Sequence, residues 1–290
     1  MKITVFTPTY NRAYILPQLY ASLARQSYKD FEWLIVDDGS TDNTKELVDK
    51  WILENKVCLR FFAQQNGGKH RAINLGARKA QGELFFIVDS DDFLTENALE
   101  RIVAHYDAIK DDDIFAGVCG LRCYPDGKRI GGEADFNILD CSPLEFRFVY
   151  KIDGDMAEVI KTEVMRQFPF PEFDGEKFCP EAVLFNRISQ KYILRYFYEK
   201  IYICDYLPDG LTEKITRVRM NSPLASMTCY SELVHYNIPV IQKMKAAINF
   251  WRFSFCSRMS YIKRIHAIPF WGILVLPIGY IYHRFDIIKN

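Results

Sequence analysis

Three carboxylates crowd one short stretch of the chain at Asp89, Asp91 and Asp92. They directly follow an apolar run, residues 84–88, that is typical of a buried strand. Carboxylates this close repel one another, and a hard divalent cation would relieve the repulsion while also binding phosphate oxygens. A solvated turn that leads into a helix N-cap explains the same residues equally well. The cluster is therefore a candidate metal site that needs support from its neighbours.

Two more polar clusters follow the first and second apolar runs of the chain. Residues 7–12 combine a ring, an amide and a cation, so that Tyr10 could stack on a base while Asn11 and Arg12 reach sugar or phosphate. Asp38, after the second run, could accept from a base N–H or a ribose hydroxyl. Taken singly, each cluster is explained at least as well by an ordinary turn.

A fourth cluster, residues 67–71, is rich in glycine and positive charge. Gly68 and Lys69 stand where a helical pattern begins, and Arg71 follows in its first turn. Backbone N–H groups at a helix N-terminus attract anions, so the cluster is a candidate phosphate site. Its glycine spacing is not that of a P-loop.

The elements that must position these clusters are apolar runs that alternate with amphipathic stretches. Continuous apolar runs between such stretches predict a mainly parallel sheet covered on both faces, and ligands of such sheets bind beyond the carboxyl ends of the strands. All four clusters should therefore meet at one edge. The expected strands are residues 3–7, 31–36, 57–62 and 84–88, and the expected helices are residues 13–26, from Thr41 or Asp42 to 54, 68–80, and from a cap at Thr95.

The order and spacing of the clusters resemble those of family 2 glycosyltransferases with the GT-A fold. Residues 7–12, 35–42, 66–69 and 89–92 carry the resemblance, which is specific over about residues 1–100 and weaker toward residue 220. It implies an α/β fold in which a Rossmann-like, mainly parallel nucleotide-binding sheet is flanked by helices, followed by a C-terminal helical appendage.

The resemblance also implies roles for individual residues. Asp91 is the expected ligand of Mn²⁺ or Mg²⁺, and Asp89, its partner in the DxD motif, is expected to contact ribose or a metal-bound water. Asp38 is expected to read the uracil edge with Tyr10 stacked on the base. Further contacts with the nucleotide sugar are expected from Thr7, Pro8, Asn11, Arg12, Gly68, Lys69, Arg71 and Ser90.

Members of this family carry their catalytic base in a Glu-Asp pair followed by an apolar helix. Residues 175–187 fit that position, with Pro180 where the Glu would stand and Glu181 where the Asp would stand. Glu181 is therefore the expected base, although a first-turn acid that favours the helix dipole would explain this residue type equally well. Glu176 is the rival base.

The catalytic domain is expected over residues 1–222, with a donor half at 1–110 and an acceptor half at 111–222. Asp155 is an acceptor-site candidate. Arg217, Arg219 and Asn221 are candidates for a loop that closes over the diphosphate, and a solvated basic turn explains them equally well.

Residues 223–290 are expected to be helical, and they are basic and aromatic. The apolar stretch 267–282 is short for a spanning helix and is interrupted by prolines. Together with seven basic and no acidic residues from Leu233 to Arg284, it predicts a peripheral anchor on an anionic cytoplasmic leaflet. Packing on the catalytic domain or on a dimer partner is the alternative. The expected interfacial rings are Trp251, Trp271, Tyr280 and Tyr282.

Composition narrows the remaining classes. Lys and Arg number 37 and so do Asp and Glu, so net charge argues against a general nucleic-acid binder. The eight cysteines lack zinc-site spacing and suit buried, reduced thiols in the cytoplasm. The N-terminus lacks the apolar core of a signal peptide.

The combined expectation is an inverting, metal-assisted transfer of a hexose or N-acetylhexosamine. The donor would be a nucleotide sugar, UDP-linked, and the acceptor a hydroxyl of a glycan or a lipid-linked glycan. A nucleotidyltransferase would carry a glycine-rich basic loop where this chain has Pro8 and Tyr10, and a Rossmann dehydrogenase would need G-x-G-x-x-G there. A membrane-bound sugar-nucleotide-binding protein without catalysis is the non-enzymatic alternative.

Overall fold

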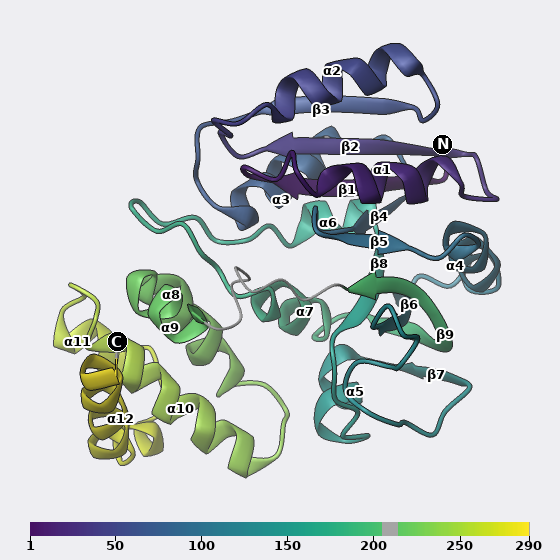
Figure 1. Cartoon of the computed structure of the whole chain (residues 1–290). Helices are drawn as coiled ribbons and strands as arrows, with labels where there is room; N and C mark the ends of the chain where they lie inside the picture. Colours follow the sequence, from purple (N-terminus) through teal and green to yellow (C-terminus); the bar gives the residue numbers. More distant parts are fainter. Residues whose placement is uncertain (205–213, 290) are drawn as a thin grey trace.

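The computed structural model describes residues 1–204 and 214–289. Within them, one sheet is flanked by helices and is followed by a separate group of C-terminal helices (Figure 1). The strand order is β3-β2-β1-β4-β8-β6-β9-β5, with β7 paired to β9. The strands are β1 (Ile3–Thr9), β2 (Phe31–Asp37), β3 (Leu59–Ala63), β4 (Leu84–Ile87), β5 (Asp92–Leu94), β6 (Phe115–Cys123), β7 (Ile138–Cys141), β8 (Met156–Lys161) and β9 (Ile193–Cys204).

The helices of the sheet domain cover both faces of the sheet, and the sheet lies between its two main apolar clusters. They are α1 (Leu16–Ala24), α2 (Thr44–Glu54), α3 (Lys69–Lys79), α4 (Ala98–Asp107), α5 (Pro143–Phe148), α6 (Thr162–Gln167) and α7 (Ala182–Ile188). The α/β prediction is thus confirmed.

The first four strands are parallel and in register, as their continuous apolar runs predict. Thr9 pairs with Asp37, and Asp37 pairs with Ala63, so these strands end side by side. The polar segments that follow them therefore lie at one edge, as expected from the sequence.

The second half departs from the parallel pattern. β8 lies between β4 and β6 and is antiparallel to both. The apolar and aromatic runs of the second half form the three longer strands β6, β8 and β9. β5, β7, α5 and α6 were not predicted, because elements this short carry too few periods of a pattern.

Two predicted helix caps were wrong. α2 begins at Thr44 with Asn43 as its N-cap, because Asp42 instead accepts hydrogen bonds from the Thr44 amide and hydroxyl and from the Ala13 amide. α4 begins after Asn97 rather than Thr95, and the side chain of Gln26 accepts a hydrogen bond from its first turn.

The C-terminal helices build a small apolar core of their own around Phe250 and Trp251. The predicted boundary at 222 falls between two of them, although Ala225 and Cys229 beyond it pack into the core of the sheet domain. Among the described residues, no helix is long and apolar enough to cross a membrane. The elements are α8 (Ile215–Asn221), α9 (Pro223–Leu233), α10 (Val240–Ser254), α11 (Tyr261–His266), the 3₁₀ helix η2 (Phe270–Ile273) and α12 (Leu276–Lys289).

Candidate active site

Asp38, which follows β2, joins that strand end to the cluster at residues 67–71. Its Oδ1 accepts from the Gln64 side chain and the Gly67 amide, both at 2.8 Å, and its Oδ2 accepts from the Gly68 amide at 2.7 Å. The expected anion at the start of α3 is therefore the carboxylate of Asp38 itself, because these amides already bind it. Among its bonds to described residues, Oδ2 takes one, which leaves a lone pair for a ligand.

Gly68 is required by its backbone and by its neighbour. Its φ of 98° and ψ of 156° lie in a region that is essentially restricted to glycine. A Cβ at this position would stand 1.9 Å from the carbonyl oxygen of Lys177. This contact brings residues 172–181 against the start of α3.

Lys69 is the centre of the site. Its ammonium lies 2.6 Å from a carboxylate oxygen of Asp89 and 2.7 Å from one of Glu181. Burial alone would lower the pKa of Lys69, but the two carboxylates outweigh it and raise the pKa. Asp89, the first residue of the expected DxD motif, and Glu181, the expected base, are far apart in sequence and thus meet on one cation.

The carboxylates at the end of β4 differ in their surroundings. Burial would raise the pKa of Asp89, but Lys69 and then Arg122 hold it below its usual value. Burial, followed by the charge of Asp89, raises the pKa of Asp91. The same two causes raise the pKa of Asp92 to about 7. Lys69 and Arg122 thus offset the negative charge of Asp89, while Asp91 still lies beside the like charge of Asp89.

Asp91 and Asp89 suit a hard divalent cation, whose charge would favour the ionised form of Asp91 against the burial and the charge of Asp89 that raise its pKa. No group of three or more His, Cys, Asp or Glu side chains arranged to hold a metal occurs within the described ranges. The remaining ligands would have to come from the diphosphate of a bound donor and from water.

Tyr202 of β9 supports this end of β4. Its hydroxyl accepts from the Asp89 amide at 2.9 Å and donates to Asp92 at 2.7 Å. The Arg122 guanidinium lies over the Tyr202 ring, 4.2 Å from its centroid, and donates to the Met156 carbonyl. These contacts hold the carboxylate turn against β6 and β9.

A cavity of about 410 Å³ opens beside Asp89 and Glu181, on the side of β6 and β8. Asp155, the acceptor-site candidate, lines it. So does Glu158, whose pKa is raised to about 7 by burial although Arg122 and Arg147 oppose that rise. Phe146, Phe185 and Tyr196 supply apolar walls. Carboxylates and ring faces together suit a polyhydroxylated acceptor.

The loop after β1 shows which of its expected contacts remain open to a ligand. The Tyr10 ring is 48% exposed and available for stacking. Asn11 uses its carbonyl oxygen to accept from the Thr41 amide at 2.7 Å, so it braces the neighbouring loop. Pro8 is buried, and the buried Thr7 hydroxyl accepts from Trp33, which leaves the backbone of these two residues for donor contacts. Burial and the charge of Asp89 raise the pKa of Asp91, and the positive charge of Arg12 opposes that rise. The Arg12 guanidinium therefore lies near the carboxylate turn.

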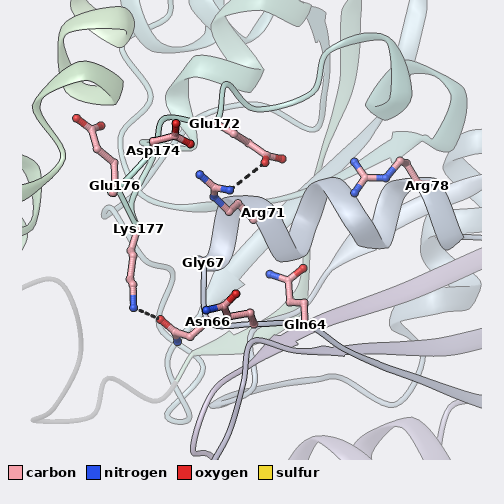
Figure 2. Close-up of a pocket in the computed structure, with 11 residues that line it drawn as sticks. Gln64, Asn66, Gly67, Arg71, Arg78, Glu172, Asp174, Glu176 and Lys177 are labelled. Atoms are coloured by element: carbon pink, nitrogen blue, oxygen red, sulfur yellow. Dashed lines mark hydrogen bonds and ion pairs between the residues drawn. The ribbon is translucent and has the colours of Figure 1, made fainter.

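Arg71 lies in a second cavity, also of about 410 Å³, between α3 and the segment before α7 (Figure 2). Its guanidinium is 3.3 Å from Glu172 and donates to the Phe173 carbonyl at 2.9 Å. Lys69 therefore pairs with two carboxylates that line the first cavity, whereas Arg71 itself lines the second, although the sequence grouped them as one anion site.

Glu176, the rival base, also lines the second cavity, but its carboxylate points to the start of α9 (Figure 2). It is buried and accepts from the amides of Leu224 and Ala225 at 2.7 and 2.9 Å. The structure thus brings Glu181, rather than Glu176, to Lys69 and Asp89.

The expected loop of Arg217, Arg219 and Asn221 is instead helix α8. Arg219 donates to the hydroxyl of Tyr230 on α9 and lies over its ring. The arginines were assigned to a loop because α8 is short and carries no buried residue to mark its face.

Four site residues were missed from the sequence: Arg122, Arg147, Glu158 and Tyr202. Arg122 and Glu158 did carry a signal, since each is a charged residue inside an otherwise apolar strand. Tyr202 carried none, because an aromatic residue is ordinary in a strand.

Comparison with known proteins identifies a family domain in the first half of the chain. The sequence model described as "Glycosyl transferase family 2" matches residues 4–131. "Glycosyltransferase GlyG" of Streptococcus pneumoniae serotype 4 is 35% identical over 115 residues, which are 40% of this chain and 38% of that protein. "Poly(ribitol-phosphate) beta-N-acetylglucosaminyltransferase TarS" of Staphylococcus aureus is 34% identical over 126 residues, which are 42% of this chain and 22% of TarS. The chain thus spans less than half of the length of these relatives.

Solved structures extend the likeness to nearly the whole chain at the level of the fold. TarS 1-349 of S. aureus in complex with UDP-GlcNAc has a TM-score of 0.64 at 20% identity, covering 98% of this chain and 88% of that one. Mannosyltransferase PcManGT of Pyrobaculum calidifontis, in complex with GDP-Man and Mn²⁺, has a TM-score of 0.58 at 17% identity, covering 98% and 87%. Residues 4–131 therefore match the family 2 glycosyltransferase domain, and the described chain has the GT-A fold of these solved structures.

Proposed function

We propose that this protein transfers a hexose or N-acetylhexosamine, with inversion, from a UDP-sugar to a hydroxyl of a glycan or lipid-linked glycan. The observation that carries the proposal is the meeting of Asp89 and Glu181 on Lys69 at the mouth of the cavity lined by Asp155 and Glu158. A donor-side carboxylate and a candidate base then face one space, which inverting transfer requires.

In the proposed reaction, Glu181 takes the proton of the acceptor hydroxyl as its oxygen attacks the anomeric carbon. The bond from that carbon to the diphosphate breaks, and the nucleoside diphosphate leaves with the electron pair. Lys69 lies within reach of both charges and stabilises the departing one when Glu181 becomes protonated. A divalent cation held by Asp91 and Asp89 would offset the charge of the diphosphate.

Donor contacts follow from the same edge of the sheet. We assign base stacking to Tyr10, base or ribose contact to Asp38 and Ser90, and diphosphate contact to Arg12 and Lys69. The exposed ring of Tyr10 and the lone pair on Asp38 support this assignment. The TarS structure with UDP-GlcNAc supports a UDP-linked donor by likeness of fold, and the PcManGT structure with Mn²⁺ supports metal use in the same way.

We also propose that the enzyme acts at the inner face of the cytoplasmic membrane, where lipid-linked acceptors are found. The basic charge of the residues after Leu233 supports this location. A non-catalytic sugar-nucleotide binder is the second candidate. The ion pair between Lys69 and the expected base, Glu181, favours it in one respect.

A donor-hydrolysis screen separates the two candidates. Purified protein with Mn²⁺ is given UDP-, GDP- and dTDP-sugars, and release of the nucleoside diphosphate is measured. The proposal predicts turnover of a UDP-sugar that is lost with EDTA and in Asp91→Ala, and retained in the matched control Asp111→Ala, whose carboxylate is exposed after α4. Metal-dependent UDP binding without turnover, alone or with glycan acceptors, would favour the non-catalytic binder.

A further inference from the structure

The last helix, α12, carries its large apolar side chains outward. Within α12, residues 278, 281, 285 and 288 are three or four apart and share one face by the period of a helix. Two more large side chains precede them, Phe270 in η2 and Leu274 in the turn before α12. All six of these side chains face solvent, with exposed fractions from 42% to 84%. We call them the outer stripe: Phe270, Leu274, Ile278, Ile281, Phe285 and Ile288.

The opposite face of α12 is small and polar, and it packs on α10. Gly279 lies so close to Trp251 that a Cβ would stand 2.5 Å from the Trp251 Cβ. His283 is buried, with its Nδ1 3.7 Å from the sulfur of Cys256. Asp286 is buried as well and accepts two hydrogen bonds from the Arg252 guanidinium, one of them at 2.7 Å.

These buried contacts fix the rotation of α12 about its axis. The Asp286 carboxylate cannot leave Arg252 cheaply, because a buried charge without its partner is strongly destabilising. Turning the helix to bury the outer stripe would also drive bulky side chains into the space that Gly279 leaves beside Trp251. A helix that packs on its own domain normally buries its apolar face, whereas α12 buries its polar face and exposes its apolar one. The outer stripe is thus a surface that a binding partner would cover.

Charge selects the partner. From Leu233 to Lys289, the sole acidic residue is Asp286, which is neutralised by Arg252. Five exposed cations lie in this region, the last two of them on α12 itself: Lys245, Arg258, Lys263, Arg284 and Lys289. A second copy would bring like charges together, whereas an anionic lipid surface complements them.

We propose that α12 lies in the plane of an anionic bilayer, with the outer stripe inserted among the acyl chains and Arg284 and Lys289 at the lipid headgroups. This inference rests on the proposed location at the membrane and specifies the surface that makes the contact. It also corrects the expected set of interfacial rings. Trp251 is fully buried and donates its indole N–H to the Gly272 carbonyl, so it belongs to the core.

The placement of α12 suits this role. It lies among the C-terminal helices, on the side of the molecule away from the sheet (Figure 1). Insertion of the outer stripe therefore leaves the edge of the sheet that carries Lys69 and Asp89 uncovered.

Vesicle co-sedimentation of the full chain tests the proposal. Phosphatidylcholine vesicles with and without phosphatidylglycerol are compared for the wild type, Ile281→Ser, Phe285→Ser and Arg284→Gln. Each apolar substitution is expected to weaken partitioning about tenfold, since each removes one buried large side chain. Arg284→Gln is expected to weaken binding about fivefold on anionic vesicles alone, with the loss shrinking at high salt. The matched control is Leu53→Ser, an 86% exposed leucine on α2, which should bind as the wild type does.

Two further readouts separate the possible outcomes. Analytical ultracentrifugation shows whether Phe285→Ser changes the association state in solution. Vesicle binding that is absent in the wild type, or unchanged in Ile281→Ser and Phe285→Ser, would overturn the proposal, and a dimer lost in Phe285→Ser would assign the outer stripe to a second copy. Donor hydrolysis in solution is measured for every variant and should stay at the wild-type rate. Loss of vesicle binding with intact hydrolysis therefore concerns the stripe, and absent hydrolysis with intact binding concerns the proposed reaction.

Discussion

Replacement of Gly68 by alanine should destabilise the protein, because two penalties coincide at this residue. Its φ of 98° and ψ of 156° are strained for any residue with a Cβ, at a cost of about 1–3 kcal/mol. The new Cβ would stand 1.9 Å from the Lys177 carbonyl oxygen, and forced overpacking of this kind costs about 1–3 kcal/mol more. The sum, roughly 2–6 kcal/mol, is a large part of the stability of a typical domain.

Urea unfolding measures this change as a lower midpoint with an unchanged slope. Gly127→Ala is the matched control, because Gly127 also has a positive φ, of 81°, but a Cβ there would meet nothing within 4 Å. The difference between the two variants isolates the contact with Lys177. Equal midpoints for Gly68→Ala and Gly127→Ala would refute the argument that Gly68 is required for the approach of residues 172–181.

Three other perturbations follow from contacts of the described residues. Glu176→Ala should cost about 1–3 kcal/mol in urea unfolding, since it removes a buried acceptor from two amides at the start of α9; a loss below that range would mean that the cap is dispensable. The hydrogen bond from Arg101, supported by His105, lowers the pKa of Glu199 to about 2 although burial opposes this. The stabilisation is therefore complete above the ordinary glutamate pKa and fades as the pH falls toward 2. Glu199→Gln should flatten the acid limb of a plot of Tm against pH, and an unchanged limb would contradict this. Tyr202→Phe should raise the KM for the donor with the fold intact by circular dichroism, because Asp89 and Asp92 lose their shared hydroxyl; an unchanged KM would show that this contact does not position the turn.

The donor half could be predicted from the sequence because its signals are local. Residues 3–7 and 84–88 are continuous apolar runs, and each is followed directly by its polar cluster. Parallel pairing then places these clusters at one edge, whatever the details of the helices between them. The structure adds few surprises there beyond the two helix caps.

The connection of Lys69 to Glu181 depends instead on packing across the whole domain. Glu181 approaches because Gly68 lets the Lys177 backbone come close, and neither residue signals its partner in the sequence. The separation of Arg71 from Lys69 has a similar origin, since Glu172 and Phe173 draw the guanidinium into the second cavity. Residues two apart in a helix, such as Lys69 and Arg71, point in different directions, so their closeness in sequence does not place them in one site.

For the C-terminal helices, the composition could be read from the sequence but the packing could not. Their charge and aromatic content were plain in the sequence, but the surface that faces outward was not. Trp251 looked like an interfacial ring and is instead the centre of a small core. The ion pair of Arg252 and Asp286, distant in sequence, decides which face of α12 is buried.

The central claim is that Glu181 is the base of a glycosyl transfer, and the most direct test compares kcat with UDP affinity in Glu181→Gln. We expect turnover of the UDP-sugar by Glu181→Gln to fall by at least about a hundredfold, because a general base typically contributes that much or more. UDP binding measured by calorimetry should stay near the wild-type value. Turnover that persists in Glu181→Gln would contradict the assignment and return the search for a base to the carboxylates of the acceptor cavity, Asp155 and Glu158.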